Sequence, residues 1–479
     1  MPAALWLVGL PIGAATLVFL LRRTWFGAIM AVLITSLLAG LVVRFSTGVA
    51  FNLLGRTIEL DQLSKVTLFL LFGATALLFL VLYLRSLYQN SVGRSSVSLQ
   101  NAGQEGRFFY PAALVILGLF AAASLSRHLG ITAIFIEIAA ILMVFVIQTE
   151  RLESTRASLR FLVLISLATP LFLLAAWQID FYQLSGGIVS PGHLERTALM
   201  VTVGFAIWLA VIPFHGWLIS TAAESSPPTA AFVLITFPIV AFSTLMHLLL
   251  DLPWLVDSFY LVDAIILAGV FTAVVAGILA SVQRGFSELM GYTALFDIGC
   301  TLVILGLGGP AAVITILVSL TVRVLALVLI AVSLSTYYLQ VPSVGFAQVK
   351  GLAYRMPFAT AGLIIGGLTL AGVPFTIGFV TRWQLFSSAM EAAPFWPFLL
   401  VIGGFGVAVG YLRGLRATFD TDKAARPRST VGQAGYQEPV PLLVVIILIS
   451  ATCIVLGLFP WLIIEPLQTV STLISFPIK

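Results

Sequence analysis

The sequence predicts an all-α polytopic membrane protein with about fourteen transmembrane helices. Of its 479 residues, 60% are hydrophobic and only 9% are charged, which excludes a soluble globular protein. Apolar stretches follow one another along the whole chain and are separated by short polar segments. Two of these stretches are interrupted by a similar proline-containing pattern, which predicts two inverted five-helix repeats, each with a broken helix.

Fourteen apolar stretches approach the length of about 20 residues that a helix needs to cross the hydrocarbon core. Two of the boundaries are short, since only Arg127 and His128 separate the fourth stretch from the fifth, and residues 308–310 separate the tenth from the eleventh. The predicted spans are 4–21, 26–44, 66–88, 109–126, 129–148, 160–177, 197–220, 229–250, 258–281, 288–307, 310–336, 358–384, 394–414 and 439–463.

The spans divide the chain into four predicted segments. Residues 1–108 form an N-terminal three-helix segment, 109–250 the first repeat, 251–415 the second repeat, and 416–479 a cytoplasmic loop with the last helix. Because five helices return the chain to the opposite side of the membrane, the two repeats are expected to be inverted. The polar segments 88–107 and 416–438 are predicted to be flexible loops.

The distribution of basic residues predicts the orientation. Loops that follow odd-numbered spans carry sixteen Lys and Arg residues, whereas the opposite side carries six. The positive-inside rule then places the odd-numbered loops in the cytoplasm and both termini outside, in a bacterial-type plasma membrane with lipid at the flanks. The net charge of +5 is typical of such cytoplasmic loops, so we expect no binding to nucleic acid.

The two predicted helix breaks are related in sequence. In the seventh span, Pro213 removes a backbone donor and clashes with the preceding turn, and His215 and Trp217 follow it. Pro374 interrupts the twelfth span in a similar sequence context, 161 residues after Pro213. Broken helices at membrane depth are typical of transporters, where they line ion and substrate paths. Trp217 is expected at the membrane interface.

Four charged residues inside predicted spans, Glu137, Asp297, Arg323 and Arg382, are candidates for proton translocation. Glu137 is interpreted either as a proton carrier or as a protonated carboxyl that is hydrogen-bonded between helices. Asp297, 160 residues later, is expected to pair with Arg323 or Arg382, either as a structural pair or as part of a proton relay. Arg382 lies two turns after Pro374, where a freed carbonyl or a carboxylate could hold it, and it is interpreted as a fixed counter-charge in preference to a mobile one.

The histidines allow several interpretations. His215 either passes a proton at neutral pH or hydrogen-bonds backbone groups that Pro213 leaves free. His247 is expected to be an interface group near a helix end, and His128 is expected to be solvated in a short loop. The two cysteines, Cys300 and Cys453, lie in apolar runs without a metal-binding spacing, so no metal site is predicted.

Several motifs resemble those of one family, the antiporter-like membrane subunits of complex I, the proton-translocating NADH:quinone oxidoreductase. The shorter members of that family are the most similar, and related cation/proton antiporters share its features. The most specific motif is Pro-Phe-His-Gly-Trp-Leu at 213–218. The other segments that carry the resemblance are 58–64, 283–284, 291–294 and 370–379.

The resemblance implies which positions carry protons in the family and how this chain differs. Glu137 matches the glutamate of the fifth span, and Asp297 lies at the tenth-span position that is often histidine. Trp208 and Ile239 stand where the family has relay lysines in the seventh and eighth spans, and Arg382 stands at a lysine or glutamate of the twelfth. Tryptophan and isoleucine do not titrate, so the usual relay is interrupted and packing is their expected role.

Three functional hypotheses follow from these features. The first is a membrane-arm subunit of a complex I-like NADH (or other donor):quinone oxidoreductase that contributes to proton translocation. The second is a non-pumping spacer or scaffold in such an assembly. The third is a subunit of a cation/proton antiporter or of a bicarbonate-uptake complex. Each implies other membrane subunits as partners. We expect no cofactor in this chain, because it has no recognisable flavin, haem, iron–sulfur or nucleotide motif.

Overall fold

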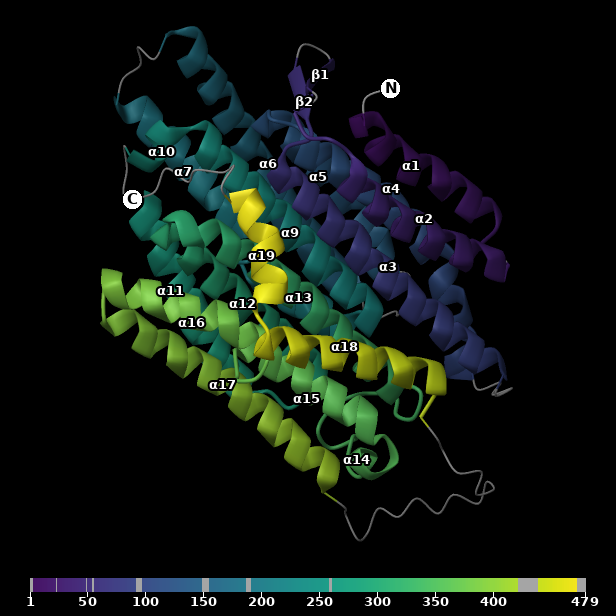
Figure 1. Cartoon of the computed structure of the whole chain (residues 1–479). Helices are drawn as coiled ribbons and strands as arrows, with labels where there is room; N and C mark the ends of the chain where they lie inside the picture. Colours follow the sequence, from purple (N-terminus) through teal and green to yellow (C-terminus); the bar gives the residue numbers. More distant parts are fainter. Residues whose placement is uncertain are drawn as a thin grey trace.

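The structure is a computed structural model that describes residues 3–22, 24–48, 50–53, 56–91, 97–148, 155–186, 191–257, 261–420 and 438–471. Within these residues the fold is a bundle of nineteen helices with one small hairpin. The N-terminal helices lie along one edge of the bundle and the green helices α16 (Ile377–Ala392) and α17 (Phe395–Phe419) along the opposite edge (Figure 1). The predicted all-α membrane fold is confirmed.

Eleven of the described helices are long and apolar enough to cross a membrane. The other three predicted spans fall on α1, on α7 with α8, and on α15 with α16, so the total of fourteen stays a prediction. The remaining helices are α1 (Ala3–Leu20), α2 (Trp25–Arg44), α3 (Gln62–Ser91), α4 (Val97–Leu125), α5 (Leu129–Gln148), α6 (Thr155–Leu184), α7 (Pro191–Trp208), α8 (Gly216–Glu224), α9 (Pro227–Asp251), α10 (Pro253–Asp257), α11 (Leu261–Val282), α12 (Phe286–Leu307), α13 (Pro310–Tyr337), α14 (Leu352–Arg355), α15 (Pro357–Ala371), α18 (Val440–Leu458) and α19 (Trp461–Ser471).

The first predicted polar loop is largely helical. Helix α3 continues to Ser91 and α4 begins at Val97, so the prediction of a flexible segment over 88–107 is wrong for the described part. Residues 97–107 include Leu, Gln, Ala, Glu and Arg, which are good helix formers even without an apolar face. Of the second predicted loop, α17 takes residues up to Phe419, and 421–437 lie outside the described residues.

A β-hairpin precedes α3 and was not expected from the sequence. Strand β1 (Ala50–Leu53) pairs antiparallel with β2 (Arg56–Glu59), with Phe51 opposite Ile58. Ile58 also forms an isolated bridge with Ser126, at the junction of α4 and α5. The hairpin therefore connects the start of α3 to the short loop between the fourth and fifth spans.

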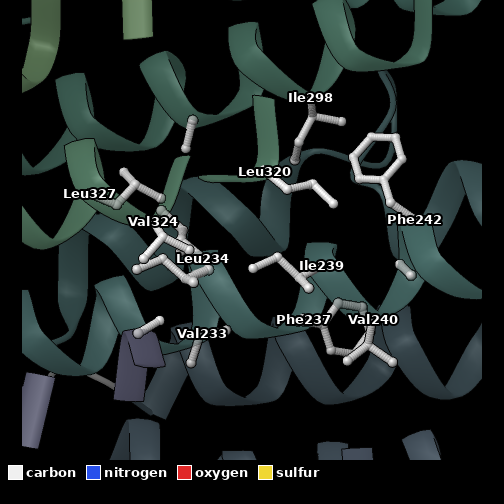
Figure 2. Close-up of a cluster of buried hydrophobic side chains, with 14 of the residues drawn as sticks. Val233, Leu234, Phe237, Ile239, Val240, Phe242, Ile298, Leu320, Val324 and Leu327 are labelled. Atoms are coloured by element: carbon white, nitrogen blue, oxygen red, sulfur yellow. The ribbon is translucent and has the colours of Figure 1, made fainter. Parts of the chain in front are cut away.

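The centre of the bundle consists of α9, α12 and α13. In the most apolar window of α9 and of α12, 94% of the residues are buried, and in that of α13, 83%. Helices that are apolar on all sides pack in the interior. Figure 2 shows side chains of α9 such as Leu234 and Ile239 meeting Leu320 and Val324 of α13 and Ile298 of α12. The charged candidates on α12 and α13 therefore project from helices that lipid does not reach.

Candidate functional site

Three of the charged candidates form one buried cluster, which we call the charge cluster: Asp297 on α12, Arg323 on α13 and Arg382 on α16. Arg323 Nη1 donates to Asp297 Oδ2 at 2.7 Å, and Arg382 Nη2 donates to Asp297 Oδ1, also at 2.7 Å. No more than 2% of any of these side chains is exposed. The expected pairing of Asp297 with an arginine is found with both arginines at once.

Prolines explain why the two arginines lie where they do. Pro238 inside α9 has no N–H for the carbonyl of Leu234, four residues earlier, and Arg323 Nε donates to that carbonyl at 2.9 Å. Pro374 likewise has no N–H for the carbonyl of Leu370, and Arg382 Nη2 donates to it at 3.1 Å. Each guanidinium thus binds both the carboxylate and a backbone acceptor that a proline has left without its helical donor.

The second helix break is shaped around Arg382. Helix α15 ends at Ala371, Gly372 takes the left-handed conformation with φ 83°, and α16 begins at Ile377. A Cβ atom on Gly372 would overlap the Arg382 side chain, so both the backbone angle and the space require glycine. The ring of Phe296 lies 5.2 Å from Arg382 Cζ, close enough for a cation–π interaction. The break therefore holds the guanidinium in a fixed position.

The charge cluster holds fixed charges in ion pairs and is poorly suited to transfer protons. Arginine does not release its proton in proteins, so neither Arg323 nor Arg382 can act as a proton donor. Both oxygens of Asp297 already accept hydrogen bonds from these cations. Of the roles considered for Arg382, the geometry favours the fixed counter-charge. The expectation of a structural pair is likewise favoured for Arg323.

The first helix break lies between α7 and α8, and a hydrogen bond from the Trp217 side chain on α8 connects the two helices across it. Trp217 is fully buried and its Nε1 donates to the carbonyl of Ile207 at 3.1 Å. One turn after the break, the indole N–H thus reaches back to the end of α7, and the expected depth of Trp217 at the membrane interface stays a prediction. Ala210, with φ 53°, adopts the left-handed conformation within the break. Pro213 itself is exposed.

His215 lies at the start of α8. Its backbone carbonyl accepts from Leu218 at 3.1 Å, while its buried Nδ1 has no partner among the described residues. That ring nitrogen therefore does not satisfy a backbone group left free by Pro213. The structure does not bring His215 into the charge cluster, so its role as a proton carrier stays a prediction.

Two buried tryptophans allow the hydrogen bond across the break to be measured. Trp208 and Trp217 are both fully buried, but only Trp217 has a partner for its indole N–H among the described residues. We expect W217F to lower the free energy of unfolding by about 1 kcal/mol more than W208F does. Denaturation of the two variants side by side measures this difference. An equal loss, or a larger loss in W208F, would contradict the assigned hydrogen bond.

The positions where the family carries lysines are filled by packed apolar side chains. The ring of Trp208 lies 4.1 Å from that of Phe172 and 6.2 Å from that of Phe237, measured between centroids. Ile239 is fully buried in the cluster that Figure 2 shows, between Phe237 and Phe242 of α9 and Leu320 of α13. The expected packing role of Trp208 and Ile239 is in keeping with these contacts.

Glu137 lies apart from the charge cluster, on α5. Its carboxylate accepts from Ser166 at 2.5 Å and from Thr169 at 2.8 Å, both on α6. The residue is only partly buried, and Ile134 and Ile138 beside it on α5 are exposed. The interpretation of a hydrogen-bonded carboxyl between helices fits this environment, although the carboxyl faces the outside of the bundle and not its centre.

A second polar cluster, which the sequence did not reveal, lies where α3 begins and α9 ends. Asp61 accepts from His247 at 3.0 Å and pairs with Arg127 at 3.3 Å, and Arg127 also pairs with Asp251 at 3.5 Å. Arg127, His247 and Asp251 line a cavity of about 220 Å³. His128 and Asp180, which also line this cavity, pair with each other at 3.1 Å. His247 is thus buried among these groups, while its expected interface role stays a prediction. His128 is half-buried and paired with Asp180, although a solvated position was expected for it. The partners are as far as 186 residues apart, which no local motif indicates.

The Asp61 carboxyl, just before α3, gives a pH prediction. Burial alone would raise its pKa, but the hydrogen bond and charge of His247 and the charge of Arg127 outweigh burial and hold the pKa well below its ordinary value. The stabilisation is therefore present at neutral pH and is lost as pH falls below about 4.

We expect D61N to destabilise the protein by about 2 kcal/mol at pH 7. The difference from the unsubstituted protein should shrink as the pH is lowered from about 5 towards 3. Thermal unfolding of both proteins across this range measures it. A difference that stays constant with pH would contradict the assigned pairing.

A bundle of membrane-crossing helices with two broken helices, one of them at a buried charge cluster, is the architecture of membrane subunits that belong to ion-translocating systems. The chain belongs to the NADH:quinone oxidoreductase/Mrp antiporter transmembrane family, whose model matches residues 126–409. This is the family indicated by the motifs at 213–218 and 370–379.

Relatives and solved structures agree with this assignment. The chain is 27% identical to NADH-quinone oxidoreductase subunit N of Chromohalobacter salexigens over 294 residues, which are 59% of this chain and 60% of that protein. It is 24% identical to subunit N of Rhodospirillum rubrum over 398 residues, 78% of each protein. The match thus spans less than two thirds of the first of these relatives.

The fold is also that of chains in solved complexes. A chain of respiratory complex I from Thermus thermophilus with bound NADH has a TM-score of 0.78 at 19% identity, covering 99% of this chain and all of that one. A chain of the Mrp complex from Dietzia sp. has a TM-score of 0.80 at 16% identity, covering 99% and 97%. At these identities the likeness establishes the fold alone.

Proposed function

We propose that this chain is an antiporter-like membrane-arm subunit of a complex I-like NADH (or other donor):quinone oxidoreductase, and that it supports proton translocation as a structural subunit with a fixed buried charge. The observation that carries this proposal is the charge cluster, in which Asp297 is held by two arginines that do not titrate. Its relatives named NADH-quinone oxidoreductase subunit N support the choice of complex.

The apolar packing at Trp208 and Ile239 supports the non-relay role. A proton relay through the membrane needs titratable groups or water at close intervals. Trp208 and Ile239 are fully buried among aromatic and aliphatic side chains, so they offer neither. In this proposal, redox chemistry and its cofactors belong to partner subunits.

The surface around Glu137 supports a neighbouring membrane subunit. An ionisable side chain that faces hydrocarbon is costly unless protein or water covers it. Glu137 is partly exposed beside the apolar side chains of Ile134 and Ile138. We propose that another membrane-arm subunit covers this face of α5 and α6, in a bacterial-type plasma membrane with both termini of the chain outside and lipid at the remaining flanks.

A second candidate function is a subunit of a cation/proton antiporter or a bicarbonate-uptake complex. The observation that favours it is the fold likeness to a chain of the Mrp complex, with a TM-score of 0.80 over 97% of that chain. This function requires no electron donor.

Identification of the native partners tests the proposal. The complex is isolated from gently solubilised membranes by a tag on this chain, and its subunits are identified by mass spectrometry. We expect flavin and iron–sulfur peripheral subunits to co-purify. Small antiporter subunits, or a soluble zinc-binding partner, in place of these redox subunits would overturn the quinone-linked proposal and support the second candidate.

A further inference from the structure

The charge cluster is not neutral. It contains one carboxylate, Asp297, and two guanidinium groups, Arg323 and Arg382, which leaves one positive charge in the interior of the bundle. No other carboxylate pairs with either arginine among the described residues. A buried charge without a counter-charge is strongly destabilising, so a membrane protein that retains one is expected to bind something that balances it.

The two arginines also have hydrogen-bond donors without acceptors. Arg323 Nη2 and both Nε and Nη1 of Arg382 are buried and have no partner in the described part of the chain. Most buried polar groups in proteins are hydrogen-bonded, so three unmet donors around one carboxylate are unusual. The unmet N–H groups need a hydrogen-bond acceptor, and the excess positive charge needs a negative charge. One bound group that is both an acceptor and an anion would satisfy both requirements.

The other polar groups nearby do not supply that acceptor. Thr301 and Ser319 are 2.9 Å apart, and Thr301 also donates to the backbone carbonyl of Asp297. Cys300 is a buried thiol on the same helix, so a thiolate there would be an alternative source of negative charge. A test must therefore separate a bound anion from a thiolate at Cys300.

We propose that a small monovalent anion, a halide or bicarbonate, binds beside Asp297 and is held by the unmet donors of Arg323 and Arg382. With the anion bound, the cluster contains two positive and two negative charges. The inference goes beyond the proposed function, because it concerns what this chain binds and holds whichever complex contains it.

The test uses the purified complex in detergent, exchanged into gluconate buffer and titrated at constant ionic strength. Chloride, bromide and bicarbonate are added in separate series, and the unfolding temperature of this chain is followed. We expect a saturable rise with at least one of these anions and no rise with further gluconate. A response to halides or to bicarbonate alone identifies the natural source. An identical response to gluconate, or no response to any anion, would overturn the proposal.

Two variants and one direct measurement complete the test. R382Q makes the cluster neutral and should lose the anion response, whereas C300S should keep it. Loss of stability in C300S, with no anion response in the unsubstituted protein, would assign the counter-charge to the thiol and overturn the proposal. Because R382Q risks failing to fold, bromide anomalous scattering from crystals of the unsubstituted complex provides a second readout. A peak beside Asp297 supports the site, and its absence in a bromide-saturated crystal of a complex that responds to halides in the titration contradicts it.

Discussion

Replacing Asp297 with asparagine should destabilise the protein by about 3–5 kcal/mol, because removal of one partner leaves the other buried charges uncompensated. The carboxylate is the only acidic partner of Arg323 and Arg382 among the described residues, and it accepts from each at 2.7 Å. The substitution keeps the size of the side chain, so the loss reports on charge and not on packing. Chemical denaturation in mixed micelles measures the change.

Asp263 provides a matched control for this substitution. It lies in the first turn of α11 and is exposed, so D263N should change the free energy of unfolding by less than about 0.5 kcal/mol. If D297N were as well tolerated as D263N, Asp297 would not be the anion that holds the two arginines. The charge cluster would then have to be balanced in another way.

Replacing Ile239 with lysine should also destabilise the protein by about 3 kcal/mol or more, because a charged group would enter a site without water or a partner. Ile239 is fully buried and belongs to the cluster of buried hydrophobic side chains in Figure 2, together with Phe237, Phe242 and Leu320. The resemblance to the family implies a lysine at this position. The stability of I239K therefore shows whether water can hydrate a lysine at this position.

Methionine at the same position separates charge from shape. I239M introduces an unbranched side chain of nearly the same length as lysine but without charge, and we expect it to cost less than about 1.5 kcal/mol. Unfolding of the two variants is compared under the same conditions. If I239K were as stable as I239M, water would reach the core at Ile239. The interpretation that packed apolar side chains interrupt a proton path at this position would then be wrong.

The sequence was sufficient to predict the class of fold, because apolar length and the positions of polar segments follow directly from the thickness of the membrane. It also located both broken helices, since Pro213 and Pro374 each remove a backbone donor that no neighbouring residue can replace. It failed over 88–107, where polar composition suggested a loop but good helix formers extend α3 and α4.

The charged site was predictable only in part. That Asp297 would pair with an arginine followed from the cost of an isolated buried charge. That both Arg323 and Arg382 bind it depends on how α12, α13 and α16 pack, and on the carbonyl that Pro238 frees on α9. The pairing of Asp61 with His247 links residues 186 apart, so it appears only when the chain is folded.

The contrast between the two halves bears on mechanism. A pair that transfers a proton must have two protonation states of similar energy, and the partners must be able to separate. In the second half, Asp297 is held on both oxygens by cations that stay charged. In the first half, Glu137 is hydrogen-bonded to two hydroxyl groups at the edge of the bundle, and Trp208 fills the interior position of a relay lysine. Among the described residues, neither arrangement has the features of such a proton-transferring pair.

The most direct test of this account is the proton-to-electron stoichiometry of the complex, purified with this chain and reconstituted in liposomes. The assembly is measured with the unsubstituted chain and with E137Q, after equal subunit content has been verified. Packed apolar side chains at Trp208 and Ile239 interrupt a proton path through this chain, and the charge of Asp297 is held by two arginines. We therefore expect the same number of protons per electron with both chains. A lower number of protons per electron in E137Q, at an unchanged rate of electron transfer, would show that protons pass through this chain and would contradict the account.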